Sequence, residues 1–125
     1  MSRMREISAA DMEIYRETAR RNKALMQEKR DLRAKLAWEV AGKAAHLLRE
    51  RFGAGKVMVF GSLLRPGHFD ERSDVDLAAW GIPEENFLSA VAAVTGIDGE
   101  ISVDLVRMEE ASSGLEAQVR EGVEL

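Results

Sequence analysis

The sequence predicts an α+β fold, in which helices back a small mixed β-sheet and a long N-terminal helix precedes it. Two observations carry this prediction. Residues 8–52 contain no proline and a single glycine among good helix formers. Beyond them, short apolar runs and helical patterns follow in the order strand, strand, helix, strand, helix.

The composition excludes several classes of protein. A chain of 125 residues suffices for one domain with a modest core. It has no cysteine, so it has neither a disulfide framework nor a thiolate metal site. There is no long apolar run and no signal-peptide pattern, so we expect a cytoplasmic protein without a membrane partner. The net charge is −4, and acidic and basic residues interleave, which does not support nucleic acid as a partner.

The long helix is predicted to begin at Ser8, with Ser8 as N-cap and Asp11 at the third position of a capping box. Gly53 suits the left-handed residue that ends it. One unbroken helix of this length would be about 65 Å long, more than a domain of this size spans. Three alternatives follow: a break near Asn22, packing of the N-terminal half on another chain, or a frayed, solvated helix.

The two halves of this helix differ in their apolar pattern. The second half carries a regular stripe at Leu36, Val40, Ala44 and Leu47, which predicts packing on the domain. The first half is sparser and reads as a surface for a partner. We therefore divide the chain into an extension, residues 1–35, for partner or dimer contact, and a domain, residues 36–125.

The central stretch contains two predicted strands. Val57–Phe60 is apolar, the pattern breaks at Gly61-Ser62, and a polar loop leads to Asp74-Val75-Asp76. After these strands we expect a helix that starts near Pro83 and carries an apolar stripe of Phe87, Leu88, Val91 and Val94. A strand over Ile101–Val106, a final helix over Met108–Glu121 and a short edge strand over Val123–Leu125 follow.

The central stretch also carries the chemistry. Asp74 and Asp76 are two residues apart, so on a strand both side chains point to one face and repel each other unless a cation lies between them. Hard divalent ions such as Mg²⁺ prefer such carboxylate oxygens and share their shell with phosphates. Gly61 allows close approach of a ligand, and Ser62 offers a hydroxyl and an N–H to a phosphate.

Each of these residues also has an ordinary structural interpretation. Glycine, serine and aspartate collect in turns, so Gly61-Ser62 and Asp74 could be turn residues only. That interpretation does not explain why Asp76 and Asp104 interrupt apolar strands. Buried carboxylates are costly, and they usually have a partner or a metal. Taken jointly, the residues favour a nucleotide and metal site.

Gly61-Ser62, eleven residues, Asp74-Val75-Asp76 and then Asp104 on a later strand resemble the signature of the polymerase-beta-like nucleotidyltransferase superfamily. The pattern is most similar to its minimal members, the MNT proteins found beside HEPN-domain partners. Arg65 falls where those proteins usually carry an arginine. The resemblance covers roughly residues 36–125, which it identifies as a minimal nucleotidyltransferase domain.

The resemblance implies a function. The chain would move a nucleoside monophosphate, AMP from ATP, to a hydroxyl acceptor such as a tyrosine of a HEPN toxin in a toxin–antitoxin pair. Asp74, Asp76 and Asp104 would be catalytic and bind Mg²⁺, while Gly61, Ser62 and Arg65 would hold phosphates. A homodimer or hetero-oligomer would form through the N-terminal helix. The alternative is a non-catalytic, antitoxin-like or scaffold subunit that acts by binding through that helix.

Overall fold

The computed structural model describes residues 8–125 and confirms the predicted fold class. Residues 1–7 of the predicted extension lie outside the described residues. Four strands form one mixed sheet in the order β3-β2-β1-β4, in which β1 is antiparallel to β2 and β4 while β2 and β3 are parallel. The helices and strands are α1 (Ala9–Phe52), β1 (Lys56–Phe60), β2 (Val75–Trp80), α2 (Phe87–Thr95), β3 (Val103–Arg107), α3 (Ser113–Arg120) and β4 (Val123–Glu124).

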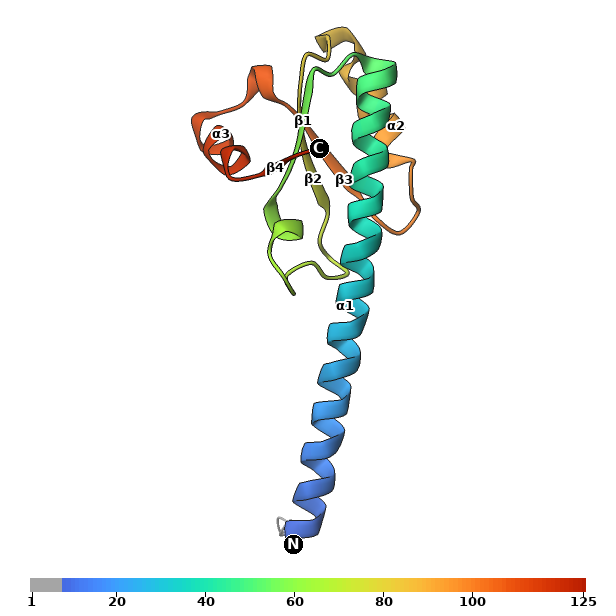
Figure 1. The fold of residues 1–125 in the computed structure, drawn as a ribbon, viewed down its shortest axis with the longest axis vertical. Coiled ribbons are helices and arrows are strands. Elements are labelled where there is room, and N and C mark those ends of the chain that lie inside the picture. Colours follow the sequence, from blue (N-terminus) through green and yellow to red (C-terminus); the bar gives the residue numbers. More distant parts are fainter. Residues whose placement is uncertain (1–7) are drawn as a thin grey trace, which may run out of the picture.

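α1 is one continuous helix of 44 residues, so the predicted alternative of a break near Asn22 is wrong. The expected caps are confirmed: Ser8 Oγ accepts the Asp11 N–H at 3.1 Å, and Gly53 adopts a left-handed conformation with φ +74°. The C-terminal half of α1 lies along the sheet, and the N-terminal half projects away from it (Figure 1).

α1 and α2 cover one face of the sheet and form the larger core. Small residues on α1 bring the helix close to the strands, whose buried side chains on this face are apolar. On α2, Ala90 and Val94 are buried, but Leu88 is 81% exposed, so its predicted place in the apolar stripe is wrong. The buried residues of this core include Ala37, Val40, Ala41, Ala44, Leu48, Val57, Val59, Leu77, Ala79 and Leu105.

α3 packs on the opposite face, where Val119 and the partly buried Leu115 meet the sheet. The prediction of one helix over Met108–Glu121 is wrong. A 3₁₀ turn spans Met108–Glu110, and the helix starts again at Ser113, because Ser112 Oγ accepts the Leu115 N–H at 3.2 Å and acts as a new N-cap. The predicted edge strand exists as β4, which pairs with β1.

Over residues 8–125, none of the helices combines the length and the apolar character that crossing a membrane requires.

Candidate functional site

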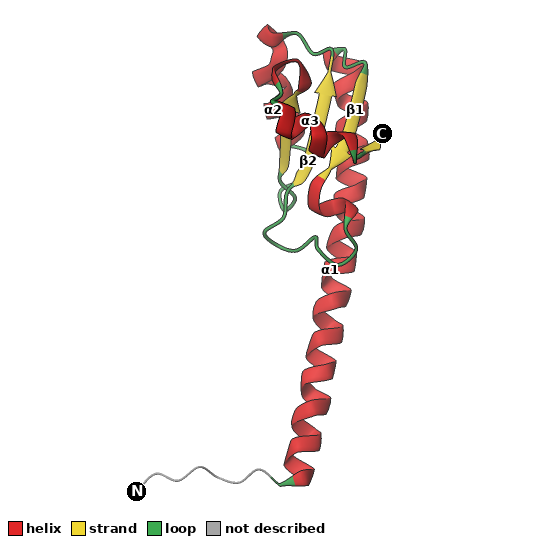
Figure 2. Cartoon of the chain, turned by 90° about the vertical axis from the view of Figure 1, so that its left-hand side faces the viewer, coloured by secondary structure: helices red, strands yellow, loops and turns green. Residues whose placement is uncertain are grey.

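The register of the sheet brings two of the three candidate carboxylates side by side. Asp76 on β2 lies opposite Phe60 of antiparallel β1 and opposite Asp104 of parallel β3. Residues directly opposite each other share a sheet face, so Asp76 and Asp104 both lie on the face that α3 partly covers. Figure 2 looks toward this face, with α3 in front of the strands. Asp74 comes directly before Val75, the first residue of β2.

Gly61 lies directly beneath the carboxylate of Asp76. It has φ +82°, a backbone conformation that L side chains rarely adopt. A Cβ at this position would collide with Asp76 Oδ2 and lie 3.3 Å from Asp76 Cγ. The turn that ends β1 and the central carboxylate of the site therefore need a glycine for two reasons, its backbone conformation and the space it leaves.

The environment of Asp76 disfavours its negative charge. Its pKa is raised from 3.8 to about 6, first because the side chain is half-buried and then because the charges of Asp104 and Asp74 repel its own. Asp74 and Asp104 are themselves exposed. The three carboxylates are thus close enough to affect one another electrostatically, and a cation among them would remove the repulsion.

The donor chemistry fits Mg²⁺, although the ligands are not already gathered. Within the described part of the chain, no three histidine, cysteine, aspartate or glutamate side chains are arranged to hold a metal ion. Three carboxylates supply the hard oxygen ligands that Mg²⁺ prefers, and Mg²⁺ usually completes its shell with water and phosphate. Binding would require the exposed side chains of Asp74 and Asp104 to turn toward Asp76.

The predicted phosphate-binding residues lie at the same end of the sheet. Gly61–Leu64 form a single 3₁₀ turn, which the Arg65 N–H closes by donating to the Ser62 carbonyl at 3.1 Å. A cavity of about 420 Å³ opens beside this turn, and both Gly61 and Arg65 line it. Ser62 is half-buried next to these two residues. The arrangement offers one cationic side chain and an open cavity next to Asp76.

Gln118 and Glu121 form the far wall of this cavity, and the sequence pattern did not single them out. They reach it because the end of α3 is packed tightly against β1 at Gly122. A Cβ on Gly122 would collide with the Val59 carbonyl oxygen and lie 3.3 Å from Phe60 Cβ. The only sequence feature that could have pointed to Gln118 and Glu121 was Gly122 after the helix. A glycine there indicates where a helix ends, but it does not indicate which part of the protein the helix end contacts.

The loop before β2 is held by the side chain of Asp70. Its Oδ1 accepts the Arg72 N–H at 2.9 Å and the Ser73 hydroxyl at 3.2 Å. The Arg72 N–H is the main reason that the pKa of Asp70 lies below its usual value. Phe69, 2% exposed, anchors the loop in the core. Asp70 therefore fixes the turn from which Asp74 enters β2.

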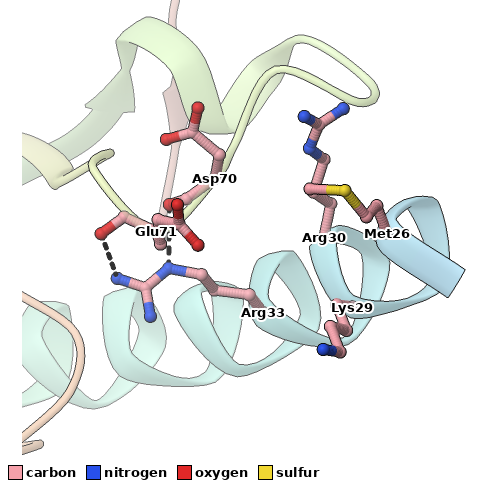
Figure 3. Close-up of a pocket in the computed structure, with 6 residues that line it drawn as sticks. All are labelled: Met26, Lys29, Arg30, Arg33, Asp70 and Glu71. Atoms are coloured by element: carbon pink, nitrogen blue, oxygen red, sulfur yellow. Dashed lines mark hydrogen bonds between the residues drawn. The ribbon is translucent and has the colours of Figure 1, made fainter. Parts of the chain in front are cut away.

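Arg33 ties this loop to α1. Its Nε donates to the Asp70 carbonyl at 2.8 Å, and its Nη2 donates to the carbonyls of Glu71 at 3.4 Å and Glu100 at 3.2 Å. Figure 3 shows the side chain reaching from the helix to the loop. A cavity of about 100 Å³ lies beside this contact, and none of Asp74, Asp76 and Asp104 lines it. Arg33 belongs to the predicted extension, yet it binds the segments that lead into β2 and β3.

Comparison with known proteins finds no family model that matches the chain and no curated protein similar to it. The resemblance to the nucleotidyltransferase superfamily therefore rests on the motif residues themselves, and the roles that it implies for them remain predictions.

Proposed function

We propose that this chain is a Mg²⁺-dependent nucleotidyltransferase that moves AMP from ATP to a hydroxyl group. The observation that supports this most is the pairing of Asp76 with Asp104 beside Gly61. A half-buried carboxylate with a raised pKa among like charges is the arrangement expected of a metal site rather than of a structural aspartate. The open cavity lined by Gly61 and Arg65 gives the phosphates a place at the same edge.

The proposed roles follow from the chemistry of each side chain. Asp74, Asp76 and Asp104 hold Mg²⁺, which supplies charge neutralisation of the phosphates. The acceptor oxygen attacks the α-phosphorus, the bond from that phosphorus to the oxygen bridging to the β-phosphate breaks, and pyrophosphate leaves. Asp104, exposed at the edge of the site, takes the proton of the acceptor hydroxyl. Gly61, Ser62 and Arg65 orient the outer phosphates.

The acceptor that we propose is a partner protein in the cytoplasm, with a HEPN-type toxin and its tyrosine hydroxyl as the first candidate. This choice comes from the resemblance to MNT proteins. Within the described residues, the cavity beside Gly61 is partly open to solvent, which leaves room for an acceptor to approach.

Transfer of label from ATP tests this proposal. The purified chain is incubated with Mg²⁺, a candidate HEPN protein and ATP that carries its label on either the α- or the γ-phosphate. We expect the α-label to appear on the acceptor, the γ-label to appear in pyrophosphate, and both reactions to stop with EDTA. Transfer of the γ-label to the acceptor would indicate a kinase and contradict the proposal.

The projecting half of α1 favours a second candidate function, a non-catalytic, antitoxin-like or scaffold subunit that acts by binding. The residues of this half are exposed almost throughout, so a binding partner could cover them. The two functions differ in which change abolishes neutralisation of the toxin. If neutralisation requires catalysis, the Asp76→Asn variant no longer neutralises the toxin. If binding through the helix is sufficient, Asp76→Asn still neutralises it, and only a chain that begins at residue 26 loses this ability.

A further inference from the structure

The N-terminal half of α1 carries an apolar line that its own domain does not cover. Ile14, Leu25 and Leu32 are 63%, 50% and 61% exposed. They are separated by 11 and 7 residues, and at about 100° per residue these spacings place all three within about 20° on the helix surface. We call these three residues the outer stripe.

The outer stripe points away from the face that packs on the sheet. Ala37 is fully buried against the domain and follows Leu32 by five residues, which corresponds to a rotation of about 140° around the helix. Ala41 and Ala44, also fully buried, continue that inner face. The domain therefore leaves the outer stripe uncovered.

This half of the helix has little support within the chain. Residues 9–25 are exposed except for the partly buried Met12, and isolated helices of this length are marginal in water. Two ion pairs, Arg20–Glu13 at 3.8 Å and Arg21–Glu17 at 3.7 Å, are exposed and add little. Stable helix formation over these residues calls for a second surface.

The charges of the helix indicate what that surface is. Residues 9–19 contain three carboxylates and one arginine, a net charge of −2. Residues 20–35 contain seven basic and two acidic residues, a net charge of +5. A second copy running antiparallel about position 23 places residues 9–19 beside residues 27–37, which have a net charge of +2, and only the central residues 20–26, with a net charge of +3, face their own copy. A parallel copy places every charged segment beside its own copy.

We propose that two copies of this chain associate through antiparallel pairing of their outer stripes. Ile14 and Leu32 are equally distant from position 23, so a two-fold axis there places Ile14 of each copy beside Leu32 of the other. The paired segment spans residues 9–37, about 43 Å at 1.5 Å per residue. Each helix start then reaches the base of the other copy's domain. This association is independent of the proposed catalytic function.

The mass of the full chain in solution tests the association. By light scattering during gel filtration at tens of micromolar, we expect twice the 13.9 kDa of one chain. Leu32→Glu should give the single-chain mass, because it replaces an apolar contact and places a carboxylate beside Glu13 and Glu17 of the other copy. Leu88→Glu is the matched control, since Leu88 is 81% exposed on α2, and it should leave the dimer unchanged. A single-chain mass for the unaltered protein, or a dimer that survives Leu32→Glu, would overturn the proposal.

Disulfide cross-linking tests the antiparallel direction. Because the chain has no native cysteine, any disulfide must involve the introduced cysteines. In an antiparallel pair, the two copies of Ile14 lie 18 residues apart along the axis, about 27 Å, while Ile14 of one copy adjoins Leu32 of the other. We expect an Ile14→Cys variant and a Leu32→Cys variant to form a disulfide only when mixed. A disulfide within Ile14→Cys alone indicates a parallel pair, and no disulfide in any combination indicates a different contact. Either result contradicts the proposal.

Discussion

Replacing Asp76 by Asn should stabilise the metal-free protein at neutral pH. Asn keeps the size of the side chain and removes the charge, which the half-buried position disfavours most and the charges of Asp104 and Asp74 disfavour further. A structural aspartate would respond in the opposite way, because its removal would lose stabilising contacts. The sign of the effect therefore separates a cation site from an ordinary strand residue.

The structure sets the magnitude and the pH range. A folded-state pKa raised from 3.8 to about 6 corresponds at most to about 3 kcal/mol at neutral pH. Because the carboxylate is only half-buried, solvent screening reduces this to about 1–2 kcal/mol. Because the pKa is raised in the folded state, the contribution of Asp76 to the free energy of unfolding is fully present below its unfolded pKa, near pH 4. This contribution is lost as the pH rises through about 6.

Denaturation curves at several pH values between 4 and 7.5, in EDTA, give the measurement. The free energy of unfolding of Asp76→Asn, measured relative to that of the unaltered protein, should rise by about 1–2 kcal/mol from pH 4 to pH 7. Each kcal/mol corresponds to roughly 4 °C in Tm. Glu39→Gln is the control, because Glu39 is an exposed carboxylate on α1. Adding Mg²⁺ should raise the Tm of the unaltered protein and leave that of Asp76→Asn nearly unchanged.

Two results would refute this reasoning. The first is an Asp76→Asn variant that is less stable than the unaltered protein at pH 7 in EDTA. The second is a stability difference that does not vary between pH 4 and 7, since it would mean that the charge of Asp76 carries no cost in the folded state.

Two further substitutions test the frame around the site. Gly61→Ala should destabilise the protein by more than about 1 kcal/mol, because Gly61 has a positive φ and an added Cβ collides with Asp76. This destabilisation should be smaller in an Asp76→Ala background, where the collision is absent. Gly42→Ala is the control and should not destabilise the protein, because a Cβ at position 42 meets nothing within 4 Å. Arg33→Ala should cost about 2–3 kcal/mol and speed amide exchange over residues 65–74, because the partly buried Arg33 side chain holds the loop. Lys35→Ala, at an exposed position of α1, should change both little, and equal effects of the two would contradict the role given to Arg33.

The sequence allowed accurate prediction of features that short stretches encode. The caps of α1 depend on Ser8 and Gly53 alone, and both are where expected. The sequence also assigned Asp76 and Asp104 to one site on two different strands, and the structure pairs these two residues directly. The predicted start of the final helix was wrong because the apolar pattern continues through Ser112. The structure shows that Ser112 caps a new helix instead of continuing the earlier one.

Contacts between distant segments could not be predicted from the pattern. Arg33 contacts the Glu100 carbonyl across 67 positions of sequence, and its place among many basic residues of α1 gave no sign of this. The same applies to Gln118 and Glu121, which line the cavity beside Gly61 only because of how α3 docks on β1. The sequence thus indicated which groups are candidates for the chemistry, and the packing determines which groups surround them.

The rate of AMP transfer by Asp76→Asn tests the central claim most directly. The charge of Asp76 is proposed to hold Mg²⁺, and metal stabilisation of a phosphoryl centre amounts to several kcal/mol. Since 1.36 kcal/mol is a factor of ten in rate, we expect Asp76→Asn to lose roughly a thousandfold or more of its transfer rate per folded molecule, while Glu39→Gln keeps the full rate. Transfer by Asp76→Asn at the rate of the unaltered protein would contradict the assignment of Asp76 and of the site built around it.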